Sequence, residues 1–218
     1  MLSKFQIEVA HIVLSATEPY GFALGGGAAL IAHGIINRLT KDIDSYTPEF
    51  DEEVFIKARE AVVDQLSHAG FSTKISKLMT WFVAIDVFDK NSGDILTIDL
   101  GQDYRSKNPI LIADLGPVLD VHDVIAGKVR AFWDRGTARD YIDIEAILRS
   151  GTTTVYELFK VLPEFFPDIT IEEFYEALIN SKRHYSDYLS YGLSKDDITI
   201  LAEHLKEYAD ELLGRKTK

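Results

Sequence analysis

The residues best suited to chemistry are a run of three glycines and two aspartates that follow it after one helix-length. Gly25, Gly26 and Gly27 come first, and Asp42 and Asp44 stand two residues apart in a predicted strand. Glycines let the backbone approach a ligand closely and expose N–H groups at a helix start, where phosphate is favoured. Alternation along a strand points both carboxylates to one face. A phosphate-binding turn beside carboxylates that can bind Mg²⁺ indicates a site that transfers a nucleotide.

A further metal ligand is expected on the strand predicted over residues 95–102. Leu96, Ile98 and Leu100 share one face of this strand, and Asp99 lies on the other. Alone, Asp99 would be an exposed residue on a half-buried strand. Beside an aspartate pair it becomes a candidate ligand, because two metal ions need several oxygen ligands. Asp86 competes with it, since plausible registers of the predicted hairpin place Asp86 beside Asp99.

Two cations stand directly before the aspartate pair. Arg38 and Lys41 can be salt-bridge partners of the acidic cluster, or they can hold the triphosphate of a nucleotide. The glycines also have an ordinary explanation, because Gly26 and Gly27 could mark a tight turn from strand to helix with no ligand. Both alternatives stay open on the residues alone.

A second group of charged residues lies on two predicted helices further along the chain. Lys128 borders the apolar face of the first, where a structural lysine would cover the core with its stem while its ammonium reaches water. As a phosphate-side cation it would instead be dispensable for folding. Thr137 to Asp140 is similar to a capping box, so Asp140 can cap the second helix. Asp143, one turn later on the same face, has no such local role.

In this order the motifs resemble the nucleotidyltransferase superfamily, and more closely the AbiEii/AbiGii toxin family of bacterial nucleotidyltransferases. The resemblance covers residues 20 to 145. It rests on Gly26-Gly27-x-Ala29, Arg38-x-x-x-Asp42-Ile-Asp44, Ile98-Asp99-Leu100, Lys128 and Arg139-Asp140-x-x-Asp143. It implies metal binding by Asp42, Asp44 and Asp99, and it favours Asp99 over Asp86. It also implies that the catalytic residues include Lys128 and Asp140, and that the nucleotide is bound by Gly26, Gly27, Arg38, Lys41, Lys128, Arg139 and Asp143.

The activity implied by the resemblance is Mg²⁺- or Mn²⁺-dependent transfer of a nucleotide from an NTP to an acceptor. The implied acceptor is the 3′ end of tRNA or another RNA, and the protein would be a toxin with an antitoxin partner. Transfer to a small molecule, as in aminoglycoside-modifying relatives, is an alternative. A non-catalytic nucleotide-binding partner protein is another. That last class normally loses a carboxylate or a phosphate-side cation, and all the matching positions are present here.

Composition sets limits on these expectations. The 218 residues include no cysteine, which excludes disulfides and Cys-ligated zinc, and no apolar run or leader indicates a membrane, so we expect a cytoplasmic protein. The net charge of −12 disfavours an overall basic footprint for nucleic acid. An RNA acceptor would therefore need a local basic patch. The candidates are Arg38, Lys41, Lys74, Lys77, Arg105, Lys107, Lys128, Arg130, Arg135 and Arg139.

The elements that must position these residues form an α/β (α+β) fold. We expect a nucleotidyltransferase-like mixed sheet with helices over residues 1–116, followed by a helical domain over 117–218. Apolar spacing and turn signals give the element ranges. Strands are expected at 20–24, around 42–44, and at 71–79, 81–89, 95–102 and 110–112. Helices are expected at 5–16, 28–36, 51–69, 120–136, from 137 onward, and at 153–162, 170–188 and 194–213.

Overall fold

The computed structural model describes residues 2–181 and 185–216. The chain divides into two compact units, Met1–Val124 and Ile125–Lys218, which are described separately here. The fold is mixed α/β, as expected from the sequence, with every strand in the first unit. The domain boundary predicted between residues 116 and 117 falls at the start of strand β7 (Gly116–Val118) and stays a prediction.

The first unit is built on a seven-stranded mixed sheet with the order β3-β4-β5-β2-β1-β7-β6. The pairs β2·β5 and β1·β7 are parallel, and the other neighbours are antiparallel. The strands β1 to β6 span Ala23–Leu24, Asp42–Thr47, Ser72–Met79, Phe82–Phe88, Ile95–Gln102 and Ile110–Ile112. Strands β4 and β5 form the expected hairpin, and their parallel neighbour β2 brings the first aspartate pair to the centre of the sheet.

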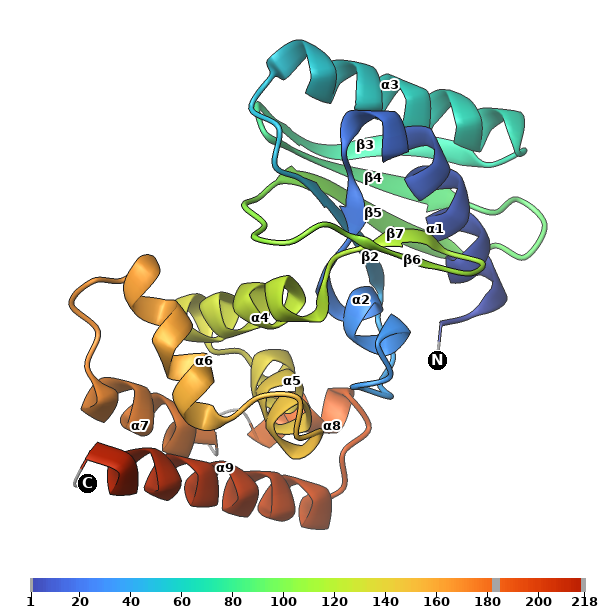
Figure 1. Ribbon diagram of the computed structural model, residues 1–218. Coiled ribbons are helices and arrows are strands. Elements are labelled where there is room, and N and C mark those ends of the chain that lie inside the picture. Colours follow the sequence, from blue (N-terminus) through green and yellow to red (C-terminus); the bar gives the residue numbers. More distant parts are fainter. Residues whose placement is uncertain (1, 182–184, 217–218) are drawn as a thin grey trace. The chain divides into compact units, whose positions relative to one another are not determined.

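Two helices cover one face of this sheet, and the other face is half-exposed. Helices α1 (Lys4–Thr17) and α3 (Glu52–His68) lie side by side on the same side of the strands (Figure 1). The alternate residues of β2, β4 and β5 that point to the core are fully buried, namely Ile43, Val83, Ile85, Val87, Ile98 and Leu100. Among the residues between them, the aspartates are only partly covered, whereas Ala84 is buried. Alternation along each strand thus separates an apolar core face from a polar face.

The strand and the helix on either side of the glycine turn are shorter than predicted. The predicted strand over 20–24 is reduced to the two residues of β1, because a 3₁₀ turn, Glu18–Tyr20, comes first and contains Pro19. Gly21 follows with a φ of +75°. Helix α2 then spans Gly26–Ala32 and ends before Gly34, whose positive φ of +72° stops it short of the predicted end at residue 36.

The described part of the second unit is helical, as expected. After α4 (Val121–Arg135), which begins in the first unit, come α5 (Ala138–Arg149), α6 (Val155–Val161), a 3₁₀ turn (Leu162–Glu164), α7 (Ile171–Ile179), α8 (Tyr185–Ser190) and α9 (Lys195–Lys216). The core contains Phe132, whose ring meets Tyr141 and Phe174 edge-on at centroid distances of 5.0 and 5.9 Å. The single helix predicted over 170–188 is observed as two helices, α7 and α8. Residues 182–184, between them, lie outside the described residues. Within the described residues, no helix is long and apolar enough to cross a membrane.

Candidate active site

The registers of β2, β4 and β5 decide which carboxylates lie together. Asp44 of β2 pairs with Asp99 of β5 across the parallel ladder, so the two side chains stand next to each other on the polar face of the sheet. Asp99 faces Ala84 of β4 on its other side. Asp86 lies opposite Thr97, whose hydroxyl donates to Asp86 Oδ1 at 2.9 Å. The parallel register of β2 and β5 thus brings Asp99 beside Asp44, and the hairpin register places Asp86 beside Thr97 instead.

The glycine turn lies directly against this carboxylate pair. The amide of Gly25 donates to the Asp44 carbonyl at 2.8 Å, which ties the turn to β2. Gly26 has a φ of +58°, and a Cβ built there would overlap the Asp44 carboxylate. Only glycine meets both conditions, the left-handed backbone and the close approach. The backbone at the start of α2 is therefore held within reach of whatever Asp44 binds.

Arg38 and Thr40, in the segment before Asp42, lie beside Gly27 of the glycine turn. A Cβ built at Gly27 would lie 3.2 Å from the Arg38 guanidinium and 3.2 Å from the Thr40 hydroxyl. Thr40 Oγ1 donates to Asp42 Oδ1 at 2.8 Å, and Arg38 also donates to the Leu39 carbonyl at 3.0 Å. The structure thus brings Gly27, Arg38 and Asp42 to one place. Lys41 is exposed beside them.

Tyr46 is a member of the site that the sequence analysis missed. It follows Asp42 and Asp44 at the same spacing of two, and its hydroxyl donates to Asp44 Oδ1 at 3.3 Å. Its ring fits against two glycines, since a Cβ at Gly25 would lie 2.6 Å from it and a Cβ at Gly101 3.1 Å. Burial, and then the negative charges led by Asp44, raise the pKa of Tyr46 well above 10. The phenol therefore stays protonated and acts as a donor to Asp44.

The donor set of this face fits a hard divalent cation. Asp42, Asp44 and Asp99 offer only oxygen, and two of them are direct neighbours in register. Within the described residues, no group of three His, Cys, Asp or Glu side chains forms a ready-made metal cage. Mg²⁺ is usually held by one or two carboxylates together with substrate phosphates and water. The adjacent aspartates with a glycine turn above them match this kind of site better than a site built from protein ligands alone.

In the second unit, Lys128 forms a buried ion pair. Its Nζ lies 2.9 Å from Asp143 Oδ2, which links α4 to α5, and the two side chains are 9% and 0% exposed. The alternative of a lysine whose ammonium reaches water is therefore wrong, because the helix face at residue 128 is covered and Asp143 supplies the countercharge. The structure brings Lys128 and Asp143 together. The phosphate-binding role implied for Lys128 stays a prediction.

Asp140 has the capping arrangement that its sequence allows. It accepts hydrogen bonds from the amide and hydroxyl of Thr137, at 3.0 and 2.6 Å, and from Nε and Nη2 of Arg135, at 2.9 and 2.8 Å. Burial alone would raise the pKa of Asp140, but these hydrogen bonds outweigh it and hold the pKa below its ordinary value. Arg139, in the same first turn of α5, is half-exposed. The catalytic role implied for Asp140 stays a prediction.

Comparison with known proteins identifies the family of the chain. The sequence pattern of the AbiEii family, described as nucleotidyl transferase AbiEii toxins of type IV toxin–antitoxin systems, matches residues 12–198. The chain belongs to the AbiEii nucleotidyltransferase toxin family. It is therefore a toxin-family nucleotidyltransferase. No curated protein is similar enough to this AbiEii-family sequence to count as a match.

Solved structures share the fold over nearly the whole AbiEii-family chain. JHP933 from Helicobacter pylori superposes with a TM-score of 0.61 at 18% identity, over 99% of this chain and 94% of its own. MenT4, a nucleotidyltransferase toxin from Mycobacterium tuberculosis H37Rv, superposes with a TM-score of 0.59 at 15% identity, over 95% and 82% of the two chains. At these identities the likeness shows the fold.

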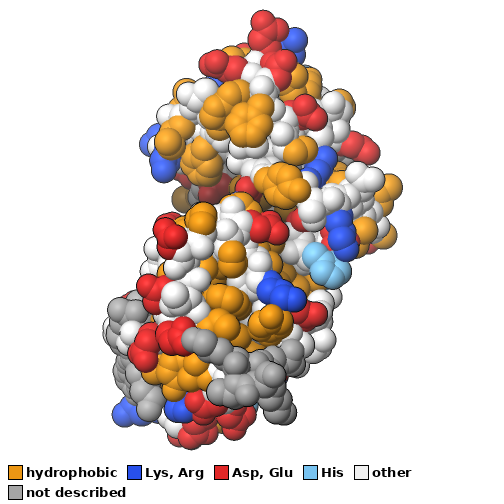
Figure 2. All heavy atoms as spheres, turned by 60° about the vertical axis from the view of Figure 1, so that its left-hand side comes forward, with side chains coloured by type: hydrophobic (Ala, Val, Ile, Leu, Met, Phe, Trp, Pro, Cys, Tyr) orange, Lys and Arg blue, Asp and Glu red, His pale blue; other side chains and the backbone are white. Residues whose placement is uncertain are grey.

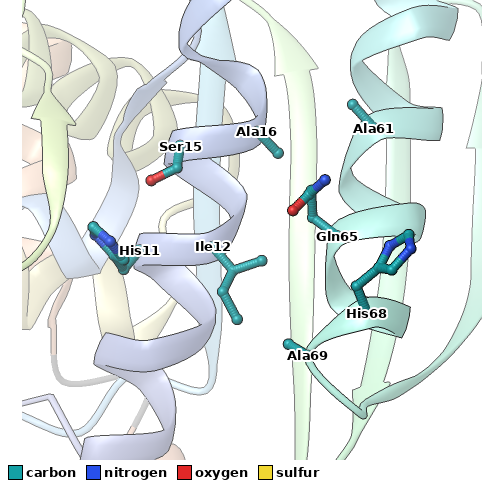
Figure 3. Close-up of a pocket in the computed structure, with 8 residues that line it drawn as sticks. All are labelled: His11, Ile12, Ser15, Ala16, Ala61, Gln65, His68 and Ala69. Atoms are coloured by element: carbon teal, nitrogen blue, oxygen red, sulfur yellow. The ribbon is translucent and has the colours of Figure 1, made fainter.

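Two hollows lie away from the aspartates of this AbiEii-family protein. One, of about 550 Å³, separates α1 and α3 and therefore lies on the helix-covered side of the sheet. Figure 3 shows His11 and His68 on its opposite walls, pointing away from each other. The other, of about 380 Å³, lies in the second unit beside Trp133 and Arg135. Neither hollow is lined by a predicted site residue.

Proposed function

We propose that this protein transfers a nucleotide from an NTP to an acceptor with the help of Mg²⁺ or Mn²⁺ held by Asp42, Asp44 and Asp99. The observation that carries the proposal is the direct pairing of Asp44 with Asp99 under the Gly26 backbone. A carboxylate pair and a close-approach glycine in one place suit a metal-bound triphosphate, which brings both negative charge and ligand oxygens.

Each residue of the first unit has a role in this proposal. The backbone at Gly26 and Gly27 contacts the phosphates, and Arg38 and Lys41 supply positive charge beside them. Tyr46 and Thr40 are positioning residues, since their hydroxyls hold Asp44 and Asp42 by hydrogen bonds. The bound divalent ion supplies Lewis acidity at the phosphate and lowers the pKa of the acceptor hydroxyl. The aspartates also orient the acceptor for attack in line with the departing pyrophosphate.

The proposal gives the charged residues of the second unit two roles, which are binding of the nucleotide phosphates and positioning of the cations that bind them. Lys128 and Arg139 are proposed as cations for the nucleotide phosphates, with Asp143 fixing the Lys128 ammonium. For Asp140 the capping contacts favour a positioning role, because its described donors are Arg135, at the end of α4, and Thr137, the N-cap of α5. A carboxylate in such contacts orders the start of α5, which carries Arg139 and Asp143.

The proposed acceptor is the 3′ end of tRNA or another RNA, and the proposed partner is an antitoxin protein. The type IV toxin–antitoxin description of the family supports an antitoxin. The toxin MenT4 among the similar folds supports a toxic activity. Lysine and arginine side chains are interspersed with acidic ones on the face drawn in Figure 2, and they do not gather there into one basic wall. We therefore propose that individual cations near the aspartates contact the RNA acceptor.

The test is transfer of label from each α-labelled NTP, with Mg²⁺, to purified tRNA, to total RNA and to small alcohols and aminoglycosides. Label on tRNA that blocks later aminoacylation supports the proposal. The Asp44→Asn variant is the control and should transfer label about 10³-fold more slowly. Label on a small molecule alone would overturn the RNA acceptor, and the absence of any transfer by the folded wild-type protein would overturn the activity.

A further inference from the structure

The polar face of the sheet continues from the aspartates to the edge strand β3. Residues paired across β2, β5, β4 and β3 share this face and form two transverse rows. One row reads Asp44, Asp99, Ala84 and Lys77. The other reads Asp42, Thr97, Asp86 and Lys74. Each row therefore begins at a proposed metal ligand and ends at an exposed lysine.

The two lysines differ in what stands beside them. Lys74 lies directly opposite Asp86, which offers a countercharge across the strand pair. Lys77 lies opposite Ala84, and its ammonium sits 5.2 Å from the centre of the Phe82 ring. Phe82 belongs to the same polar face, where its ring and that of Tyr46 flank Gly101. The Lys77 ammonium thus lies beside an aromatic ring, and within its row only Ala84 stands between Lys77 and Asp99.

Both lysines also protect the edge of the sheet, since β3 has a strand on one side only. Charged residues on an edge strand prevent pairing with other chains. A lysine at either position serves this purpose equally well. Edge protection therefore explains why β3 carries lysines, but it does not explain the row that Lys77 shares with Asp44 and Asp99.

We propose that Lys77 binds a backbone phosphate of a polynucleotide acceptor whose end lies at Asp44 and Asp99. The proposal rests on the proposed function and narrows its acceptor to a nucleic acid. Neighbouring strands are about 4.8 Å apart, so the Cα of Lys77 lies about 10 Å from that of Asp99. That is roughly the length of three stacked nucleotides at ~3.4 Å each. A small alcohol or an aminoglycoside bound at the aspartates has no backbone phosphate for this cation to bind.

Ala84 is the smallest residue of its row and is only 8% exposed. Its side chain is small, and it lies between Asp99 and Lys77 in register. A larger side chain here would stand in the proposed course of the acceptor chain without touching the charges. Ala84→Leu therefore offers a second variant, in which the acceptor is blocked sterically while Asp99 and Lys77 remain.

The first experiment measures binding of a tRNA in Mg²⁺ as a function of salt for the wild type, Lys77→Gln and Lys57→Gln. Lys57 is the matched control, because it is exposed on α3, on the helix-covered side of the sheet, and pairs with Glu53. Loss of one phosphate contact should lower the slope of log K against log salt by about 0.7 to 0.9. We expect this decrease and a three- to tenfold weaker affinity for Lys77→Gln only. Equal slopes and affinities for the three proteins would overturn the proposal.

The second experiment measures transfer, with the NTP and the acceptor varied separately. Lys77→Gln and Ala84→Leu should raise KM for the RNA acceptor at least threefold and leave KM for the NTP and kcat unchanged. Unchanged acceptor KM in both folded variants would overturn the role of Lys77 while the nucleotidyltransferase activity stands. If the wild type transfers nothing, the proposed function fails, and the salt dependence of RNA binding still decides whether Lys77 contacts phosphate.

Discussion

The two units hold their carboxylates in opposite ways. In the first unit, Asp44 and Asp99 lie next to each other on a half-exposed sheet face, with like charges in adjacent register. In the second unit, Asp143 and Asp140 are buried against protein cations, Lys128 and Arg135. Adjacent carboxylates repel each other, and a bound metal ion would relieve this repulsion, whereas a buried carboxylate that is paired with a protein cation is already balanced.

This difference distinguishes aspartates that are proposed to bind metal from aspartates that stabilise the fold, although both kinds look alike in the sequence. Both groups are Asp-rich motifs close to Lys or Arg, and the family resemblance assigns both to one site. The packing shows that removal of an aspartate should have different consequences in the two units. In the first unit it relieves repulsion and removes a proposed metal ligand. In the second unit it removes the partner of a cation, which is buried for Lys128 and partly exposed for Arg135.

The largest expected effect is on activity in the first unit. Asp44→Asn and Asp99→Asn should each lower kcat by about 10³-fold, which is ~4 kcal/mol of transition-state stabilisation. In metal-free buffer their melting temperatures should equal or exceed that of the wild type, because one of two adjacent negative charges is gone. Asp86→Asn, on the same face but opposite Thr97, is the matched control and should keep activity within threefold. An equal loss of kcat in all three variants would contradict the assignment of Asp44 and Asp99, and not Asp86, to the metal site.

The next effect is on stability in the second unit. Lys128→Met should lower the free energy of unfolding by about 3–5 kcal/mol, because it leaves the buried Asp143 carboxylate without its cation. Lys128→Met with Asp143→Leu should recover most of this loss, since a buried ion pair is commonly replaceable by apolar groups. Chemical denaturation measures both. Lys57→Met, at an exposed pair, should change stability by no more than about 1 kcal/mol. A Lys128→Met protein as stable as the wild type would restore the expectation that this lysine is dispensable for folding.

A smaller effect, with a defined pH dependence, is expected at Asp140. Asp140→Asn should cost about 2–3 kcal/mol at neutral pH through lost charge-assisted hydrogen bonds. The pKa of Asp140 is lower in the folded than in the unfolded protein, so its stabilisation is complete above the ordinary carboxyl value near ~3.9 and is lost as pH falls through the folded value. The difference between wild type and variant should therefore be constant from about pH 5 to 8 and shrink below about pH 4. A difference that grows on acidification would contradict this.

The sequence predicted the regular elements well where local signals were strong. Helix α3 lies within the predicted range 51–69, and Gly70 follows it with a positive φ. The Ile110–Ile112 strand was predicted at its observed limits, but β7 was missed. Its three residues contain Gly116 and Pro117, which indicate a turn, and only pairing with β1 and β6 makes them a strand.

The site was predictable in its residue types and less so in its contacts. Alternation placed Asp42, Asp44 and Asp99 on polar faces, but only the register of three strands shows that Asp99 adjoins Asp44. Tyr46 followed the same spacing and was missed, because its role depends on Gly25 and Gly101 giving its ring room. The burial of Lys128 likewise depends on a helix contact that periodicity does not contain.

The central claim is that the metal binds to the paired carboxylates of the first unit. The most direct test is a calorimetric titration of Mn²⁺ into protein that is mixed with a non-hydrolysable NTP analogue. Three proteins are compared: the wild type, the double variant Asp44→Asn/Asp99→Asn, and Asp140→Asn. We expect wild-type binding to be lost in the double variant and retained in Asp140→Asn at a temperature where all three are folded. Mn²⁺ binding that survives in the double variant and disappears in Asp140→Asn would contradict the account and move the metal to the second unit.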